Sequence, residues 1–289
     1  MRSQVGRPVR RRARSGPGRG GTGVRAVRKA LALGLSVGVI SLGYGYFHWV
    51  PRASSARLPA TPACSAVLFE NRRFTQCVAK PGRHIITTRI TGKNGVIYRG
   101  FAPLSRDIKP DRVAFAVNGG MYDTSSQPIG YYVENKNRLH QINRRDGKGN
   151  FYLKPNGVFY GATKGPWAVL SSDDFTKQVS KRPELGTQSG PMLLIDGKFN
   201  PHISQSGTSE KIRNAVGVDD RGQAHFVISD EPVSFGLLAR MMRDHCKTPN
   251  ALFLDGTVSS LWDPATGRLD AQFPLGPLIV VEKATKGVP

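Results

Sequence analysis

SFGLLARMMRDHCKTPNALFLDGTVSSLW, residues 234–262, is the stretch of the chain that most constrains its fold. Ser234 is a suitable helix N-cap, and the apolar residues after it recur at helical spacing, which predicts a helix over 234–246. Pro249 prevents much continuation, and the apolar run 251–254 then predicts a fully buried strand. This strand ends abruptly in Asp255 and Gly256. Because loops after buried strands often display reactive groups, this corner is a candidate functional site.

From about Cys64 onward the chain is a series of short strand-like runs separated by glycine, asparagine and proline. Tight turns are predicted at Asn94-Gly95, Asp146-Gly147, Asp196-Gly197 and Arg221-Gly222. With no internal repeat and no second linker, residues 64–289 are predicted to form one α+β domain on a mixed, mostly antiparallel sheet with few helices. The expected strands are Ala66–Phe74, His84–Ile90, Val113–Val117, Tyr131–Glu134, Val158–Tyr160, Met192–Ile195, Ala215–Val218 and Ala224–Ser229.

The net charge of +22 is unevenly distributed along the 289 residues. Residues 1–60 hold 12 of the 42 Lys and Arg residues and none of the 20 acidic residues, so the rest of the chain is only moderately basic. Residues 1–29 combine these cations with glycine, serine and proline, which predicts a disordered tail. Its charge suits a topology determinant better than a nucleic-acid site, and we expect no nucleic-acid partner.

Residues 30–50, ALALGLSVGVISLGYGYFHWV, are apolar and long enough for a helix to cross a bilayer. The basic tail would hold the upstream flank in the cytoplasm, so the segment predicts a transmembrane anchor or a signal segment followed by a linker over 51–63. The domain is then expected in the periplasm, anchored to the inner membrane through residues 30–50, or secreted if the segment is cleaved.

Three cysteines fit export to an oxidising compartment. Cys64 and Cys77 flank the predicted strand 66–74 and are candidates for a disulfide that ties down the start of the domain. Cys246, at the end of the predicted helix, is then a buried thiol. The sequence contains no CxxC or HExxH motif, and its six histidines are scattered, so no metal site is expected.

Two more corners resemble the one at Asp255. Asn118-Gly119-Gly120 follows an apolar run; its glycines permit close approach of a ligand, and Asn118 offers a donor and an acceptor. Arg213 precedes the strand 215–218, where a guanidinium can hold a phosphate or carboxylate through two hydrogen bonds. Each corner also has a plainer interpretation, namely a structural turn at 118–120, a surface ion pair at Arg213 and a capping aspartate at 255.

The Asp255 corner has two further features of a catalytic site. Its carboxylate emerges from a buried strand, where poor solvation raises a carboxyl pKa and suits it to acid–base chemistry. Ser259 and Ser260 follow it and can hydrogen-bond a sugar or a phosphate. Weaker corners of the same type are Asn156-Gly157, preceded by aromatic residues that can stack on a sugar, and the run 188–191, which contains Ser189.

Together these segments resemble the phosphodiester glycosidase family, over residues 64–283. The resemblance rests on the order and co-occurrence of AVNGGMYD, GNFYLKPNGVFY, QSGPMLLIDGKFNP, RNAVGVDDRGQAHFVIS and ALFLDGTVSSLW. It implies an α+β fold whose corners meet at one cleft, and hydrolysis of a sugar-1-phosphodiester. By motif position, the implied pocket residues are Asn118, Gly119, Gly120, Arg213, Asp255, Gly256, Ser259 and Ser260. Residues 255–260 depart from the LDGGGS run of eukaryotic members, which leaves the sugar specificity open.

The resulting hypothesis is an extracytoplasmic hydrolase that converts a glycosyl phosphodiester into a sugar and a phosphomonoester. Arg213 would hold the phosphate, Asp255 would act as base or nucleophile, and Asn118 would help to orient the sugar. The substrate-binding set is Gly119, Gly120, Asp123, Asn156, Ser189, Glu210, Gly256, Ser259 and Ser260; Glu210 and Asp123 are the candidates for a second acid, should one be needed. The scheme requires no cofactor or metal.

Two other functions are compatible with the same residues. A non-catalytic envelope module would use the pocket to bind a cell-envelope glycan or an anionic polymer without cleaving it. An ordinary glycoside hydrolase would act without the phosphate, and Arg213 would then matter little for turnover.

Overall fold

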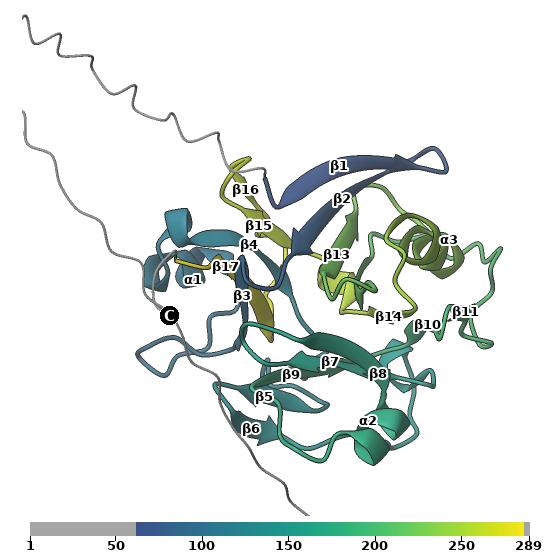
Figure 1. Cartoon of the computed structure of the whole chain (residues 1–289), viewed down its shortest axis with the longest axis horizontal. Coiled ribbons are helices and arrows are strands. Elements are labelled where there is room, and N and C mark those ends of the chain that lie inside the picture. The colour runs from purple at the N-terminus through teal and green to yellow at the C-terminus, as the bar shows by residue number, and fades with distance from the viewer. Residues whose placement is uncertain (1–61, 286–289) are drawn as a thin grey trace, which may run out of the picture. The chain divides into compact units, whose positions relative to one another are not determined.

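A seven-stranded antiparallel sheet forms the largest layer of the computed structural model, which describes residues 62–285 (Figure 1). In spatial order it consists of β1 (Cys64–Phe69), β2 (Arg72–Ala79), β13 (Ala224–Ser229), β12 (Asn214–Val218), β14 (Asn250–Phe253), β10 (Met192–Ile195) and β11 (Lys198–Phe199). The central strands β12, β13 and β14 are apolar and buried on both faces, as their near-continuous hydrophobic runs predict.

Two five-stranded sheets complete the fold. One has the order β16 (Arg268–Leu269), β15 (Leu261–Asp263), β4 (Val113–Asn118), β17 (Leu278–Lys283), β3 (His84–Arg89). The other has the order β6 (Asn137–His140), β5 (Tyr132–Glu134), β9 (Leu185–Ser189), β7 (Gly157–Gly161), β8 (Trp167–Ser171). Neighbouring strands in all three sheets are antiparallel, so the predicted α+β class with mostly antiparallel pairing is confirmed. The prediction of one sheet is wrong, because the strands divide among three.

The three sheets share one hydrophobic core. Phe115 of β4, Phe226 of β13 and Phe159 of β7 come from different sheets and meet edge to face, with ring centroids 5.4 and 5.6 Å from Phe226. All three rings are at most 2% exposed. Burying three aromatic side chains at one junction contributes several kcal/mol to folding, so this contact holds the sheets together and fixes where their strand ends meet.

Three short α-helices cover outer faces of the sheets: α1 (Phe101–Asp107), α2 (Ser172–Gln178) and α3 (Phe235–Arg240). Ser234 caps α3 as predicted, since its side chain accepts a hydrogen bond from the Leu237 amide. The predicted helix over 234–246 is only partly α-helical, because residues 241–245 widen into a π-helical turn. Three 3-10 turns lie at Pro110–Arg112, Asn150–Tyr152 and Gly256–Val258.

The start of the domain differs from the prediction. Instead of one strand over 66–74, the chain forms a hairpin of β1 and β2, and Glu70 and Asn71 turn it with φ of 45° and 59°. This register sets Cys64 directly opposite Cys77, and the two form a disulfide, as predicted. Cys246 is a free buried thiol, also as predicted, and burial raises its pKa to about 12.

The basic tail over 1–29, the apolar segment 30–50 and nearly all of the linker over 51–63 lie outside the described residues. Within residues 62–285, no helix is both long and apolar enough to span a bilayer. The membrane anchor therefore stays a prediction from the sequence.

Candidate active site

Asn118, the last residue of β4, is the hub of the candidate site. It is 1% exposed, and its Nδ2 donates to the carbonyl of Asp255 over 2.8 Å. Its Oδ1 accepts from Asn214 Nδ2 at 2.8 Å and from the Ser260 amide at 3.0 Å. One buried amide thus joins β4, β12 and the loop after β14, three segments far apart in the sequence. Because its Oδ1 and one of its two Nδ2 hydrogens are used inside the protein, we assign Asn118 the role of a positioning residue.

The two glycines after Asn118 allow the end of β4 to pack against its neighbours. The Gly119 amide donates to the carbonyl of Pro277, and the Gly119 carbonyl accepts from the Asp255 amide. A Cβ on Gly120 would lie 2.1 Å from the carbonyl oxygen of Gln188, closer than any real contact. Gly120 is therefore required for close backbone approach to β9, the physical role that the sequence suggested.

The loop after β14 is held from several directions. A Cβ on Gly256 would lie 2.3 Å from the ring of Phe253 and 3.6 Å from the carbonyl of Ile212, so this loop passes close to the residue before Arg213. Ser259 Oγ contacts Asn214 Oδ1 at 3.3 Å and the Gly256 carbonyl at 2.9 Å. Ser260 Oγ donates to the Val258 carbonyl. The two predicted corners at Arg213 and Asp255 therefore lie side by side.

Arg213 is buried and has no carboxylate partner within residues 62–285. Its Nε donates to the Val233 carbonyl at 2.8 Å and its Nη2 donates to the Ser209 carbonyl at 3.0 Å. The guanidinium carbon lies 3.8 Å from the ring centroid of Phe235 and 5.6 Å from that of Phe253. Burial lowers the pKa of Arg213, but an arginine keeps its charge in proteins, so aromatic faces and carbonyl oxygens hold a full cation here.

This guanidinium borders a cavity of about 590 Å³. Its lining combines polar side chains with the aromatic rings of Phe235, Phe253 and Phe273. The lining consists of Asn150, Ser209, Lys211, Ile212, Arg213, Phe235, Phe253, Gly256, Thr257, Ser259, Gln272 and Phe273. We call it the Arg213 cavity. Its volume suits a small sugar phosphate, and Arg213 and Lys211 provide two cations.

Asp255 connects the hub to this cavity through its backbone, because its carbonyl accepts from Asn118 Nδ2. It is not itself a lining residue, although Gly256 and Thr257 are. Burial raises the pKa of the Asp255 carboxyl, and a hydrogen bond from the Thr257 backbone partly opposes this shift. Tyr122 also senses this carboxyl. Burial, and then the charge of Asp255, raise the pKa of Tyr122 to about 12. A carboxyl with a raised pKa suits acid–base catalysis, as the sequence predicts.

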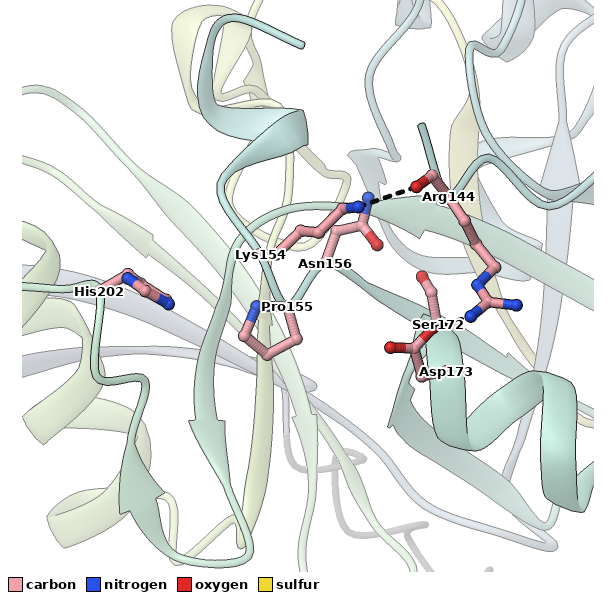
Figure 2. Close-up of a pocket in the computed structure, with 7 residues that line it drawn as sticks. All are labelled: Arg144, Lys154, Pro155, Asn156, Ser172, Asp173 and His202. Carbon is pink, nitrogen blue, oxygen red and sulfur yellow. Dashed lines mark hydrogen bonds and ion pairs between the residues drawn. The ribbon is translucent and has the colours of Figure 1, made fainter. Parts of the chain in front are cut away.

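A second cavity, of about 420 Å³, contains the predicted residue Asn156 (Figure 2). Figure 2 shows Arg144 beside Asp173 and His202 on the opposite wall, and Lys154, Pro155, Asn156 and Ser172 complete the lining. Arg144 forms a 2.7 Å ion pair with Asp173, and Lys154 forms one with Asp146 at the same distance. We call it the Arg144 cavity. Its two strong cations are both paired with carboxylates.

Two chain segments, 150–156 and 202–209, border both cavities. Asn150 and Ser209 line the Arg213 cavity, whereas Lys154, Asn156 and His202 line the Arg144 cavity. Behind segment 150–156 lies the corner 188–191, where a Cβ on Gly190 would be 2.8 Å from the carbonyl of Phe151. The predicted corners therefore come together in one region of the fold. Those at 213 and 256–259 line the Arg213 cavity, that at 156 lines the Arg144 cavity, and those at 118–120 and 188–191 line neither.

The hydroxyl of Ser189 is an exception to the satisfied polar groups in this region. Ser189 is fully buried, and its Oγ has no hydrogen-bond partner in the part of the chain that the structure describes. Buried polar groups are normally paired, because an unpaired one costs free energy. Ser189 lines neither the Arg213 cavity nor the Arg144 cavity.

Asp123 and Glu210 lie outside both cavities. Asp123 is exposed and its Oδ1 caps a turn by accepting from the amides of Ser125 and Gln127. Glu210 faces Arg72 at 3.4 Å on the surface. Neither is positioned to serve as a second acid. Among residues 62–285, no three His, Cys, Asp or Glu side chains cluster in an arrangement that could hold a metal ion.

Several lining residues were not found from the sequence. Phe235 was assigned to the apolar face of the helix, yet it stacks on Arg213. Lys211 precedes Arg213 by two residues, a spacing that places both near one strand mouth, and was overlooked. Phe273 is 47% exposed in the loop before β17, and no local pattern marks it as a site residue. Phe151, by contrast, is buried and cannot stack on a sugar as expected.

The sequence profile of the phosphodiester glycosidase family matches residues 111–273, more than half of the chain. The chain belongs to the phosphodiester glycosidase family. The predicted resemblance is thereby confirmed, and the family makes this protein a glycosidase-type hydrolase. The chain is also 35% identical over 191 residues to the uncharacterized protein YigE of Escherichia coli (strain K12), covering 66% of this chain and 74% of YigE.

Solved structures add evidence on the fold. The catalytic domain of zebrafish N-acetylglucosamine-1-phosphodiester alpha-N-acetylglucosaminidase, auto-inhibited by its pro-peptide, matches with a TM-score of 0.53 and 15% identity, covering 78% of this chain and 86% of that domain. A hypothetical protein from Synechocystis matches with a TM-score of 0.49 and 14% identity, covering 76% and 61%. At this identity the zebrafish domain shows that the fold is shared.

Proposed function

We propose that the protein is an extracytoplasmic hydrolase that cleaves a sugar-1-phosphodiester into a free sugar and a phosphomonoester. Family membership supports the reaction class, and the zebrafish neighbour is named for a glycosyl phosphodiester substrate. The observation that most favours a phosphate-bearing substrate is the unpaired guanidinium of Arg213 at the edge of the Arg213 cavity.

Arg213 is assigned to the phosphate. Within the described residues it forms no ion pair, and its Nη1 donates to no protein atom, so a donor and a full positive charge are available to a ligand. A cation fixed in a site of low dielectric constant stabilises the negative charge that develops on a departing phosphomonoester, and such groups contribute about 10²–10³-fold to turnover. Lys211, on the same wall, adds a second positive charge.

Asp255 is assigned to the attacking water. The water oxygen bonds to the anomeric carbon, the bond from that carbon to the phosphate oxygen breaks, and its electron pair leaves with the phosphomonoester. Asp255 accepts the proton that the water loses. A phosphate is a good leaving group, so the reaction does not require the second carboxylic acid that ordinary glycosidases use. This fits the placement of Asp123 and Glu210 away from the cavity.

The sugar is assigned to the far side of the Arg213 cavity. Ser259 and Gln272 offer hydrogen bonds there, and the ring of Phe273 offers an apolar face against which a sugar can pack. Asn118 contributes indirectly by holding the Asp255 loop, because its own hydrogen bonds are already made within the protein.

An extracytoplasmic location is supported by two separate features. The cationic tail followed by an apolar run in residues 1–50 predicts export, and the Cys64–Cys77 disulfide suits an oxidising compartment. In this proposal the substrate is a sugar phosphate or a cell-envelope glycan, and the membrane is reached through residues 30–50.

The test is hydrolysis of synthetic sugar-1-phosphodiesters by the purified full chain, with matched sugar glycosides that lack the phosphate. We expect turnover of the phosphodiesters and its loss in Asp255→Asn and Arg213→Lys. If the glycosides are cleaved as well as the phosphodiesters, the chain is an ordinary glycoside hydrolase. Equal inertness of wild type and Asp255→Asn, with persistent glycan binding, identifies a binding module and overturns the proposal.

A further inference from the structure

A third cavity, of about 730 Å³, is strongly basic. It forms where the β2–β3 turn, the β12–β13 turn and the end of β17 meet. Its charged and titratable lining residues are Lys80, Arg83, His84, Arg221, His225 and Lys283. None of its lining residues is an aspartate or a glutamate. It shares no lining residue with the Arg213 or Arg144 cavities.

The sheets hold these cations together. Lys283 of β17 pairs with His84 of β3, and the amide of His84 donates to the carbonyl of Lys80. Ala224, just after the turn that bears Arg221, pairs with Ala79, the residue before Lys80. Four cations from three chain segments are therefore brought to one hollow by strand register, and they are not a chance cluster along one loop.

The positive charge is largely uncompensated. Lys80, Arg83 and Lys283 form no ion pair with any described carboxylate, whereas Arg221 contacts Asp219 at 3.0 Å. Asp219 does not line the cavity; it also contacts Nε2 of His225, which does. Burial, and then the charges of Lys80, Arg83 and Lys283, lower the pKa of His84. Like charges held this close repel one another, and a bound anion would remove that cost.

The cavity also marks the point where the chain enters the domain. Pro62 and Ala63 line it, and the disulfide of Cys64 anchors this edge. Eleven residues, 51–61, separate the predicted membrane segment 30–50 from this edge of the domain along the sequence. Clustered cations near a membrane surface attract anionic headgroups.

We propose that this cavity binds a phosphate group, with the headgroup of an anionic phospholipid as the favoured source and a soluble phosphate ester as the other. Lys80 and Arg83 are the principal contacts, because both are exposed and unpaired. Such a site would orient the domain on the membrane, independently of the reaction in the Arg213 cavity.

The histidines provide a local readout for the full chain. Among the described residues, His84 and His225 line this cavity, whereas His140 and His202 do not and report binding elsewhere. His245 shares Gln76 with His225, so it is not used as a separate reporter. Labelled imidazoles are followed by NMR in dodecyl maltoside during titration with dihexanoyl phosphatidylglycerol. Glycerol 3-phosphate is the soluble arm, and dihexanoyl phosphatidylcholine, a zwitterion whose phosphate charge is offset by its own ammonium group, is the control without net charge.

We expect phosphatidylglycerol to shift the signals of His84 and His225, and Lys80→Ala with Arg83→Ala to weaken that response by about tenfold or more, as loss of charge-assisted hydrogen bonds predicts. Lys109→Ala with Arg106→Ala is the matched control and should leave the response unchanged. A response to glycerol 3-phosphate alone supports the phosphate site and assigns it to a soluble ligand. No selective shift, or a shift that survives the double substitution, overturns the proposal. Phosphodiester turnover in the double variant should equal that of wild type.

Discussion

The Arg213 and Arg144 cavities contain similar residues in opposite electrostatic states. In the Arg144 cavity the arginine pairs with Asp173, and these two side chains are 55% and 61% exposed. In the Arg213 cavity the arginine is 3% exposed and rests on aromatic rings and carbonyl oxygens. Asp255, which precedes the cavity-lining Gly256, has a raised pKa and no cationic partner among the described residues. A charge neutralised within the protein has little left for a ligand, so the pairing pattern distinguishes the two cavities more clearly than their composition.

The contrast also separates stability from function. An exposed ion pair contributes about 0–1 kcal/mol to stability and loses little when water replaces one partner. A buried and unpaired charge costs free energy in the folded state, and such sites occur where the charge is needed for binding or catalysis. The four predictions below test this contrast.

The largest effect is expected for the two aspartates. Asp255→Asn should lower kcat/KM for a sugar-1-phosphodiester by about 10²–10⁴-fold, because it removes the proton acceptor. Asp173→Asn, the matched control, should change kcat/KM by less than about threefold, since Asp173 is exposed and paired. Both are read from initial rates. Equal effects of the two substitutions would break the distinction between the cavities.

The two arginines come next. Arg213→Lys should lower kcat/KM by about 10²–10³-fold, because an ammonium cannot reproduce the planar guanidinium stacked on Phe235. Arg144→Lys should leave the rate nearly unchanged. Thermal unfolding of each variant checks that the protein is folded. A wild-type rate in Arg213→Lys would remove the phosphate from the proposed mechanism.

A smaller effect is expected from the glycine that brings β4 against β9. Gly120→Ala should lower the free energy of unfolding by about 1–3 kcal/mol, because its Cβ would overlap the Gln188 carbonyl. Gly100→Ala is the control, since a Cβ there would have nothing within 4 Å. The measurement is urea-induced unfolding. A stability equal to wild type for Gly120→Ala would mean that the strand end moves freely, and that Gly120 does not define the site.

The smallest effect concerns the pH dependence of stability. The folded-state pKa of Asp255 lies above its ordinary value of 3.8, so ionisation is unfavourable in the folded protein. At pH below 3.8 the carboxyl is neutral in both states and costs nothing; as pH rises through the raised pKa, wild type loses stability relative to Asp255→Asn. Urea unfolding at a series of pH values measures this difference. A difference that shrinks as pH rises would show that Asp255 is stabilised as an anion.

Local patterns were sufficient for much of the fold. The apolar runs at 192–195 and 224–229 are strands with the predicted bounds, and Ser234 caps its helix. The single strand expected over 66–74 is a hairpin, because Glu70 and Asn71 accept positive φ although neither is the glycine that usually marks such a turn. The helices α1 and α2 were missed, since seven-residue helices contain too few turns to show a clear periodicity.

The candidate site was predicted in its parts and not in its assembly. The corners at 118–120, 213 and 255–260 were recognised from strands that run into glycine and polar residues. Three features of the site were not predictable from sequence. Asn118 forms hydrogen bonds within the protein, Glu210 faces Arg72, and Phe235 and Phe273 border the cavity. Each of these facts depends on partners that are distant along the chain.

The sequence by itself determined the class of fold, the family, the disulfide and the residue types available for chemistry, because these depend on local periodicity, spacing and motif order. Only the tertiary structure decided which charges remain unpaired. Whether Arg213 or Arg144 keeps its charge for a ligand depends on which carboxylate lies within reach, and that is set by how three sheets pack around Phe226.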